Sequence, residues 1–193
     1  MNWYKKAEGK PNNYEEMKDW FEKRTKNHIE RVQKYCKKVA DEFPEFKELI
    51  ERGKIHDQSK YKSPEMEPYI YTTWQYKCKD DGREFECPDG MDEKMSIATE
   101  HHVKHNRHHP EFHCKKEVDL INRGDRDKPP EEIIDATGMK DLDVAEMCAD
   151  WMSMSEERGG KPQEWAKKNV NVRWEFTDEQ EELIYKILDN VWE

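Results

Sequence analysis

This sequence of 193 residues lacks the long apolar run of a membrane protein. No stretch approaches the eighteen or so consecutive apolar residues that a membrane-spanning helix needs. The first ten residues, MNWYKKAEGK, also lack the apolar core of a secretory signal. We therefore expect a cytoplasmic protein without a membrane partner.

Clusters of one charge sign are missing as well. The sequence carries 44 acidic and 34 basic residues, a formal net charge of -10, and its lysines and arginines are interleaved with acids. A nucleic-acid-binding surface needs a basic patch, so we expect no nucleic acid among the partners.

Cysteine is scarce and shows no pairing pattern. The five cysteines are an odd number without a C-x-x-C pair, which is typical of reduced thiols in a reducing compartment. Cys78, Cys87 and the His113–Cys114 pair are conceivable zinc ligands, but the eight-residue gap between the first two is not a usual spacing for such a site.

Apolar residues make up only 34% of the chain, against 40% charged residues, but they recur at helical spacing. The pattern predicts helices over about 14–42, 92–107 and 141–158, and a capping box at Thr177–Gln180 predicts a last helix from Asp178. Weak alternation around Asp81–Gly82 predicts a small hairpin or loop insertion at 76–90. We expect an all-α bundle in one domain over 13–193, after a polar arm over 1–12.

Three further signals concern helix ends. Ser63 and Pro64 predict the N-cap and first residue of a helix, and Pro129–Pro130 predicts one or two helical turns. Lys26–Asn27 marks a position where the first helix is open to a break.

The strongest feature present is a histidine-rich segment, HHVKHNRHHPEFH, over 101–113. It holds six of the eight histidines, and imidazole is the commonest neutral metal ligand. On a helix over 92–107 two or more rings would share a face, and Pro110 predicts that this helix ends near His108. The alternative is a surface histidine tract that binds metal adventitiously or not at all.

Candidate ligands also occur elsewhere in the chain. His28 borders the apolar stripe of the first predicted helix, and Asp150 lies on the edge of the apolar face of the 141–158 helix. His56 and Asp57 are adjacent, and successive side chains on a helix diverge by about 100°, so both could reach one ion or Asp57 could bridge two.

In chain order, His28, the His56–Asp57 pair and Asp150 resemble the HD-domain superfamily, whose helical core holds one or two metal ions. The segments HDQSKY, HHVKHNRHHPE and MCADWMSMSEERGG look closest to an uncharacterised HD-like family of phages and bacteria. The resemblance covers about residues 20–190. It implies an HD-domain-like helical bundle and, if a phage encodes the protein, the host cytoplasm as its compartment.

The resemblance also implies roles for individual residues. One divalent ion, of iron, manganese, cobalt, zinc or magnesium, would be held by His28, His56, Asp57 and Asp150. Asp57 would bridge to a second ion held by His102 and His109, with His101 and His108 as the alternatives within each pair. Lys60, which completes an H-D-x-x-K pattern, would act with Asp57 in catalysis and contact substrate, and further substrate contacts would come from His105 and Asn106.

Three functions remain open on these residues. The first is a metal-dependent phosphohydrolase that acts on a small phosphate ester, such as a nucleotide, through a metal-activated water. The second is a mixed-valence di-iron oxygenase acting on a small polar substrate, an activity also found in the superfamily. The third is a binding module that keeps the fold without turnover.

Overall fold

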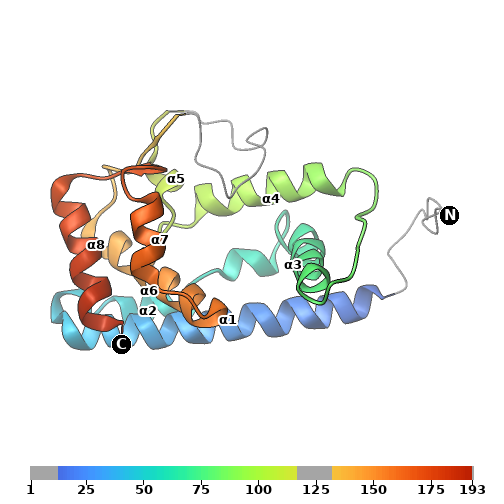
Figure 1. Cartoon of the computed structure of the whole chain (residues 1–193), viewed down its shortest axis with the longest axis horizontal. Helices are drawn as coiled ribbons and strands as arrows, with labels where there is room; N and C mark the ends of the chain where they lie inside the picture. The colour runs from blue at the N-terminus through green and yellow to red at the C-terminus, as the bar shows by residue number, and fades with distance from the viewer. Residues whose placement is uncertain (1–12, 117–131, 193) are drawn as a thin grey trace.

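A computed structural model of the chain describes residues 13–116 and 132–192. Within these ranges the protein is an all-α bundle, as expected, with only two short strands (Figure 1). The predicted arm over 1–12 and the predicted turns at Pro129–Pro130 lie outside the described residues.

The longest element is α1, Tyr14–Glu42, which runs along one side of the molecule (Figure 1). It continues through Lys26–Asn27 without a break. Its buried residues recur at helical spacing, and α2, α3, α6 and α8 pack against it. This helix is therefore the support on which the other elements are arranged.

The middle of the chain departs from expectation at several helix ends. After a 3-10 turn at Pro44–Phe46 come α2, Leu49–Ile55, a second 3-10 turn at Gln58–Tyr61, and α3, Met66–Asp80. The α3 helix begins at Met66 and not at Pro64, and Glu65 is its N-cap residue without a side-chain cap. Because α3 continues to Asp80, the predicted insertion is a loop over 83–88 and not a hairpin.

The histidine-rich segment also folds differently from a single long helix. The helix α4, Met91–His105, ends three residues before the predicted end at His108, because Asn106 has an extended backbone with φ −111° and ψ 118°. A short helix α5, Pro110–His113, follows. His108 and His109 thus lie on the turn between two helices, where they can face in a direction independent of α4.

The C-terminal part is formed by α6, Asp141–Arg158, α7, Pro162–Asn169, and α8, Asp178–Val191. The predicted capping box is present: Thr177 Oγ1 accepts from the Gln180 backbone N–H at 3.2 Å, and Gln180 Oε1 accepts from the Thr177 N–H at 2.9 Å. Strands β1, Ile134–Asp135, and β2, Trp174–Glu175, form a two-residue parallel pair that the sequence pattern did not predict.

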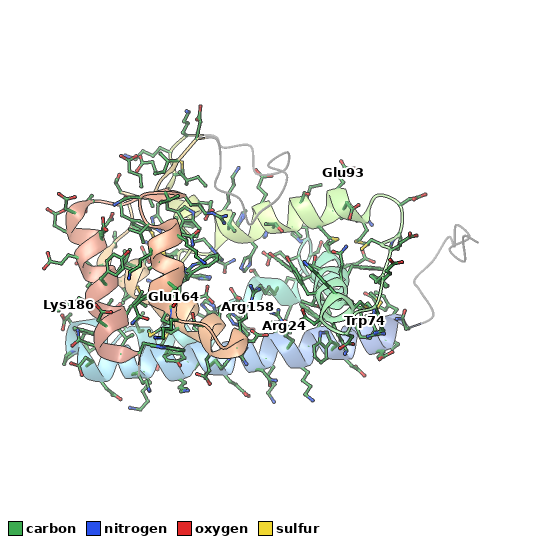
Figure 2. All side chains as sticks on the ribbon, viewed as in Figure 1. Arg24, Trp74, Glu93, Arg158, Glu164 and Lys186 are labelled. Carbon is green, nitrogen blue, oxygen red and sulfur yellow. The ribbon has the colours of Figure 1, made fainter. Side chains whose placement is uncertain are left out.

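Two separate hydrophobic clusters pack along α1. One contains Tyr14, Met17 and Phe21 with residues of α3 and α4, such as the buried Trp74 labelled in Figure 2. The other begins at Val32 and includes most of the buried side chains of α6 and α8. His28 lies on α1 between these two clusters, so a buried polar region occupies the space between them.

No helix among the described residues is long and apolar enough to cross a bilayer.

Candidate metal centre

The His56–Asp57 pair lies at a break between two helical segments. His56 follows α2 with an extended backbone (φ −53°, ψ 134°), and Asp57 has a left-handed backbone (φ 56°, ψ 16°). Neither residue is helical, which corrects the helical geometry assumed from the sequence. The positive φ is uncommon for a residue with a side chain, although aspartate tolerates it better than most. The break aims both side chains into the core, where they are 2% and 1% exposed.

Asp57 is the point on which the histidines converge. Its Oδ2 atom is 3.3 Å from Nε2 of His28, and its Oδ1 atom is 3.6, 3.3 and 3.5 Å from the Nε2 atoms of three more rings, those of His56, His102 and His108. On the far side of the first two rings, Asp150 Oδ1 lies 3.2 Å from His28 Nε2 and 3.8 Å from His56 Nε2. The same nitrogen of four imidazoles therefore points at one buried carboxylate.

These separations fit ligands that share an ion better than they fit hydrogen bonds. With metal–ligand bonds of about 2.1 Å, two ligand atoms lie about 3.0 Å apart at right angles and about 3.4 Å apart in a tetrahedron. His56 Nε2 and Asp57 Oδ1 are fully buried and have no hydrogen-bond partner among the described residues. Buried polar atoms normally have a partner, and a cation held between these side chains would supply one to both atoms.

The donors fall into two groups that correspond to the predicted sites. His28, His56 and Asp150 form one, and Asp57, His102, His108 and His109 form the other; in each, one donor atom per residue lies within 4.8 Å of all the others. The predicted ligands are thus brought together, and of the alternatives His108 joins His109 without replacing it. His101 is in neither group: its Nδ1 is 2.7 Å from Glu65 Oε1, and its ring stacks on His105.

Outer partners hold the histidines in this orientation. His28 Nδ1 is 3.0 Å from Ser153 Oγ, His56 Nδ1 is 3.0 Å from Glu146 Oε1, and His102 Nδ1 is 2.8 Å from Glu65 Oε2. A ligand histidine that gives its Nδ1–H to such a partner presents Nε2 to the metal. All three partners are buried.

Sequence reasoning missed these outer residues, although α6 carried a signal for two of them. Glu146, Asp150 and Ser153 recur at spacings of four and three on α6, so they share one face of that helix. The signal for Glu65 was misleading, because an acid at the start of a helix is expected to interact with the helix N-terminus. Glu65 instead turns inward and accepts from His101, His102 and Ser59.

A third set of possible donors is His56, His108 and Glu146. In this set His56 would bind an ion through Nδ1, whereas in the first group the same ring would bind through Nε2. A neutral imidazole has a lone pair on only one nitrogen, so a His56 ring that offers Nε2 to an ion carries its proton on Nδ1 and can donate it to Glu146. We therefore assign Glu146 to the outer partners.

The charges of the centre suit metal binding. Burial opposes ionisation of Asp57, but chiefly the charges of His56 and Lys60, with a hydrogen bond from His28, outweigh it and hold the pKa of Asp57 well below its usual value. The pKa of Asp150 is likewise lowered, because hydrogen bonding and charge from His28 overcome the effect of burial. Metal ligation requires ionised carboxylates, so both acids are in the required form.

Two histidines of the second group are held neutral by burial. It lowers the pKa of His108 to about 3, with a further contribution from the charge of His56, and it lowers the pKa of His102 against the attraction of Asp57. His56 behaves oppositely: burial would lower its pKa, but Asp57 and Glu146 raise it. Only the neutral ring has a lone pair for a metal.

The three predicted substrate contacts lie near the centre in different settings. Lys60 Nζ is 2.5 Å from Asp57 Oδ2, and the Lys60 side chain is 20% exposed. Asn106 is half-buried and donates to Ser59 Oγ and to the His102 carbonyl. His105 is exposed, with its Nδ1–H donated to the carbonyl of His101. Lys60 and Asn106 therefore both contact candidate metal ligands, Lys60 the carboxylate of Asp57 and Asn106 the residue His102.

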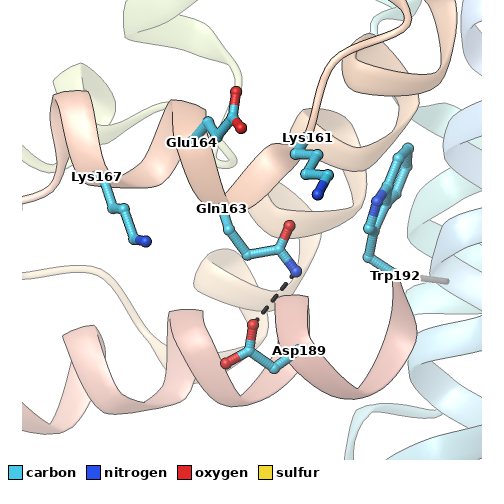
Figure 3. A pocket seen from close by; sticks show the side chains of 6 residues that line it. All are labelled: Lys161, Gln163, Glu164, Lys167, Asp189 and Trp192. Carbon is cyan, nitrogen blue, oxygen red and sulfur yellow. Dashed lines mark hydrogen bonds between the residues drawn. The ribbon is translucent and has the colours of Figure 1, made fainter.

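A surface hollow elsewhere shares no residue with this centre. It lies between α7 and α8 and is lined by Lys161, Gln163, Glu164, Lys167, Asp189 and Trp192 (Figure 3). Gln163 donates to Asp189 across it at 3.3 Å. Its lining is mostly charged and contains no group of metal-ligating side chains, so it does not compete with the histidine centre as a functional site.

Comparison with known proteins gives one match. A family model described as "Family of unknown function (DUF5662)" matches residues 17–190, which span every candidate ligand. No curated protein and no solved structure matches the chain. The resemblance to the HD-domain superfamily thus stays a prediction.

Proposed function

The chain belongs to the DUF5662 family, and from the ligand geometry of its core we propose that it is a metal-dependent phosphohydrolase. Its substrate would be a small phosphate ester, most simply a nucleotide, and its cofactors one or two divalent ions. His28, His56 and Asp150 would hold one ion, and His102, His108 and His109 the other. Five free cysteines suit a reducing cytoplasm, in which we place the reaction.

The single observation that carries the proposal is the position of Asp57 between the two groups. One of its oxygens faces His28 of the first group, and the other faces His102 and His108 of the second group together with His56 of the first. A carboxylate is expected to bridge the ions of a two-metal site when further candidate metal ligands face each of its two oxygens. When bound, two such ions lower the pKa of a water molecule and stabilise the charge on a phosphoryl group.

The charge balance of the centre also favours a phosphate substrate. Five buried or half-buried carboxylates surround it, those of Asp57, Glu65, Asp143, Glu146 and Asp150, and three cationic side chains, Lys60, Arg52 and Arg107, oppose them. These side chains carry a net charge of −2, because five negative charges face three positive ones. Two bound divalent ions would change that net charge to +2. A dianion such as a phosphate monoester would neutralise that charge.

Lys60 would serve both the carboxylate and the substrate. Its ammonium balances Asp57, and burial, which would lower the pKa of Lys60, is outweighed by the charge of Asp57, which raises it. Lys60 therefore stays charged at neutral pH. With its side chain partly exposed, it would donate to a phosphate oxygen beside the ions.

The test is phosphate release from a panel of nucleoside mono-, di- and triphosphates. Metal-free protein would be supplied in turn with manganese, cobalt, magnesium or iron, with Asp57→Asn as the blank. Asp41→Asn, a change of the same kind at an exposed position, is the matched control. We expect release in the wild type and the control and none in the blank. Release that persists in the blank would contradict the proposal.

The second candidate is the di-iron oxygenase. The observation that favours it is the makeup of the second group, three imidazoles and one carboxylate, since neutral imidazoles suit iron. Iron-loaded protein that consumes oxygen with a small polar substrate, and releases no phosphate with any metal, would establish it. A protein that binds metal and does neither would fit a binding module instead.

A further inference from the structure

Glu146 contacts histidines of both metal groups. Its Oε1 atom is 3.0 Å from Nδ1 of His56 and 3.6 Å from Nδ1 of His108. The two ring centroids are 4.2 Å apart, and the Nε2 atoms of both rings face Asp57. Each ring thus stands between two carboxylates, Asp57 on its metal side and Glu146 on the opposite side.

A chain of ion pairs fixes the position of Glu146. Arg52 places Nη2 2.5 Å from Glu146 Oε2 and Nη1 2.6 Å from Asp143 Oδ1. Arg107 contacts the other oxygen of Asp143 at 3.0 Å. Both carboxylates are almost fully buried, so swinging Glu146 away would break a largely buried ion pair and leave Arg52 with Asp143 as its remaining partner.

We propose that Glu146 is a positioning residue shared by both metal groups. It accepts the Nδ1–H of His56 and lies 3.6 Å from Nδ1 of His108, where its charge favours a proton on that nitrogen, and so leaves Nε2 of one ligand of each ion facing Asp57. This inference rests on the metal centre proposed above and not on the reaction catalysed there. Its consequence is that the loss of one carboxylate that binds no metal weakens the binding of two ions.

The alternative is that Glu146 is itself a ligand of a third ion, with the Nδ1 atoms of His56 and His108. The two assignments differ in what they predict. If Glu146 is a positioning residue, the wild type binds two ions, and the loss of Glu146 weakens the binding of both. If Glu146 is a ligand of a third ion, the wild type binds three ions. The loss of Glu146 then removes one ion and leaves the binding of the other two unchanged.

The test compares Glu146→Gln with wild type in cobalt(II) binding, measured by titration against a chelating dye and by the visible absorption of the bound cobalt. Glu156→Gln is the matched control, since Glu156 lies on the same helix but contacts Lys34 and Tyr35 at the surface. We expect the affinity for both ions to fall about 10–100-fold in Glu146→Gln, as is typical when an outer partner is lost. The cobalt absorption bands should also shift, which a purely structural role would not cause.

A second variant guards against misfolding. Arg52→Gln together with Glu146→Gln removes the ion pair as a unit, while Asp143 keeps Arg107 as its cationic partner, and the same loss of affinity is expected. Unchanged binding of both ions, or a loss confined to one, would overturn the inference while leaving the metal centre intact. Wild-type protein that binds no cobalt would overturn the metal centre itself and the inference with it.

Discussion

Replacement of Asp57 by asparagine should remove metal-dependent stabilisation completely, because this residue contributes to both ions. Asparagine keeps the shape of the side chain and tolerates the left-handed backbone at this position, where φ is 56°. What the substitution removes is the negative charge. In the wild type both carboxylate oxygens of Asp57 lie 3.3–3.6 Å from histidine Nε2 atoms. Asp150→Asn provides a comparison, since Asp150 belongs to the first group alone.

The expected size follows from binding linkage. An ion present at a hundred times its dissociation constant stabilises the folded state by about 2.7 kcal/mol, so two ions give about 5.4 kcal/mol. For a chain of this length each kcal/mol raises Tm by about 2–4 °C, which predicts a rise of about 10–20 °C for the wild type. Asp150→Asn should retain about half of that rise, and Asp57→Asn almost none.

The assay is thermal unfolding of each variant with manganese and with excess chelator. Each protein is compared with its own metal-free form, so any loss of stability from the substitution itself cancels. An Asp57→Asn protein that keeps half of the wild-type rise would refute the assignment of Asp57 as a shared ligand. Equal loss in the two variants would instead show that only one ion binds.

Three other changes test separate parts of the structure. Glu65→Gln should weaken the second ion alone by about 10–100-fold, since Glu65 orients His102, and isothermal titration would reveal an unexpected effect on the first ion. Burial opposes ionisation of Asp143, but hydrogen bonds from two arginines hold its pKa below the usual value. Its contribution to stability is therefore complete above the unfolded pKa of about 3.9 and is lost progressively as the pH falls from there through the lower folded pKa. With chelator present, urea unfolding between pH 5 and 3 should show a smaller loss of stability for Asp143→Asn than for wild type, and parallel curves would contradict this. Thr177→Ala should cost about 1 kcal/mol, seen as a Tm lower by about 2–4 °C, because it removes one half of the α8 capping box.

The sequence was sufficient to predict elements governed by local spacing. The helices α1, α6 and α8 follow from apolar periodicity, and the start of α8 follows from its capping box. The end of α4 was misplaced because the proline at 110 restricts only the residue before it, whereas the helix ends at Asn106, whose side chain donates to the His102 carbonyl. That end is set by a local hydrogen bond that spacing does not reveal.

Most of the side chains that the structure brings together were predicted from the sequence, whereas the outer residues that orient them were missed. Histidine and aspartate are unusual inside an apolar face, so His28 and Asp150 could be found from one helix at a time. Glu65 and Glu146 are glutamates in a chain rich in glutamate, and their roles depend on partners 37 and 90 residues away along the sequence. His56 and Asp57 were singled out from the sequence, but their non-helical backbone was not predicted, because the dipeptide itself carries no signal for it.

The separation of the two hydrophobic clusters along α1 has a consequence for how such a chain can change over evolutionary time. The cluster around Met17 and Phe21 and the larger cluster beyond Val32 are separated by the polar region at His28. Within the smaller cluster Tyr69 is set apart, because its ring meets the His102 ring edge-on with centroids 5.7 Å apart. Substitution of Met17 or Phe21 would therefore alter packing alone, whereas substitution of Tyr69 would also disturb a candidate ligand.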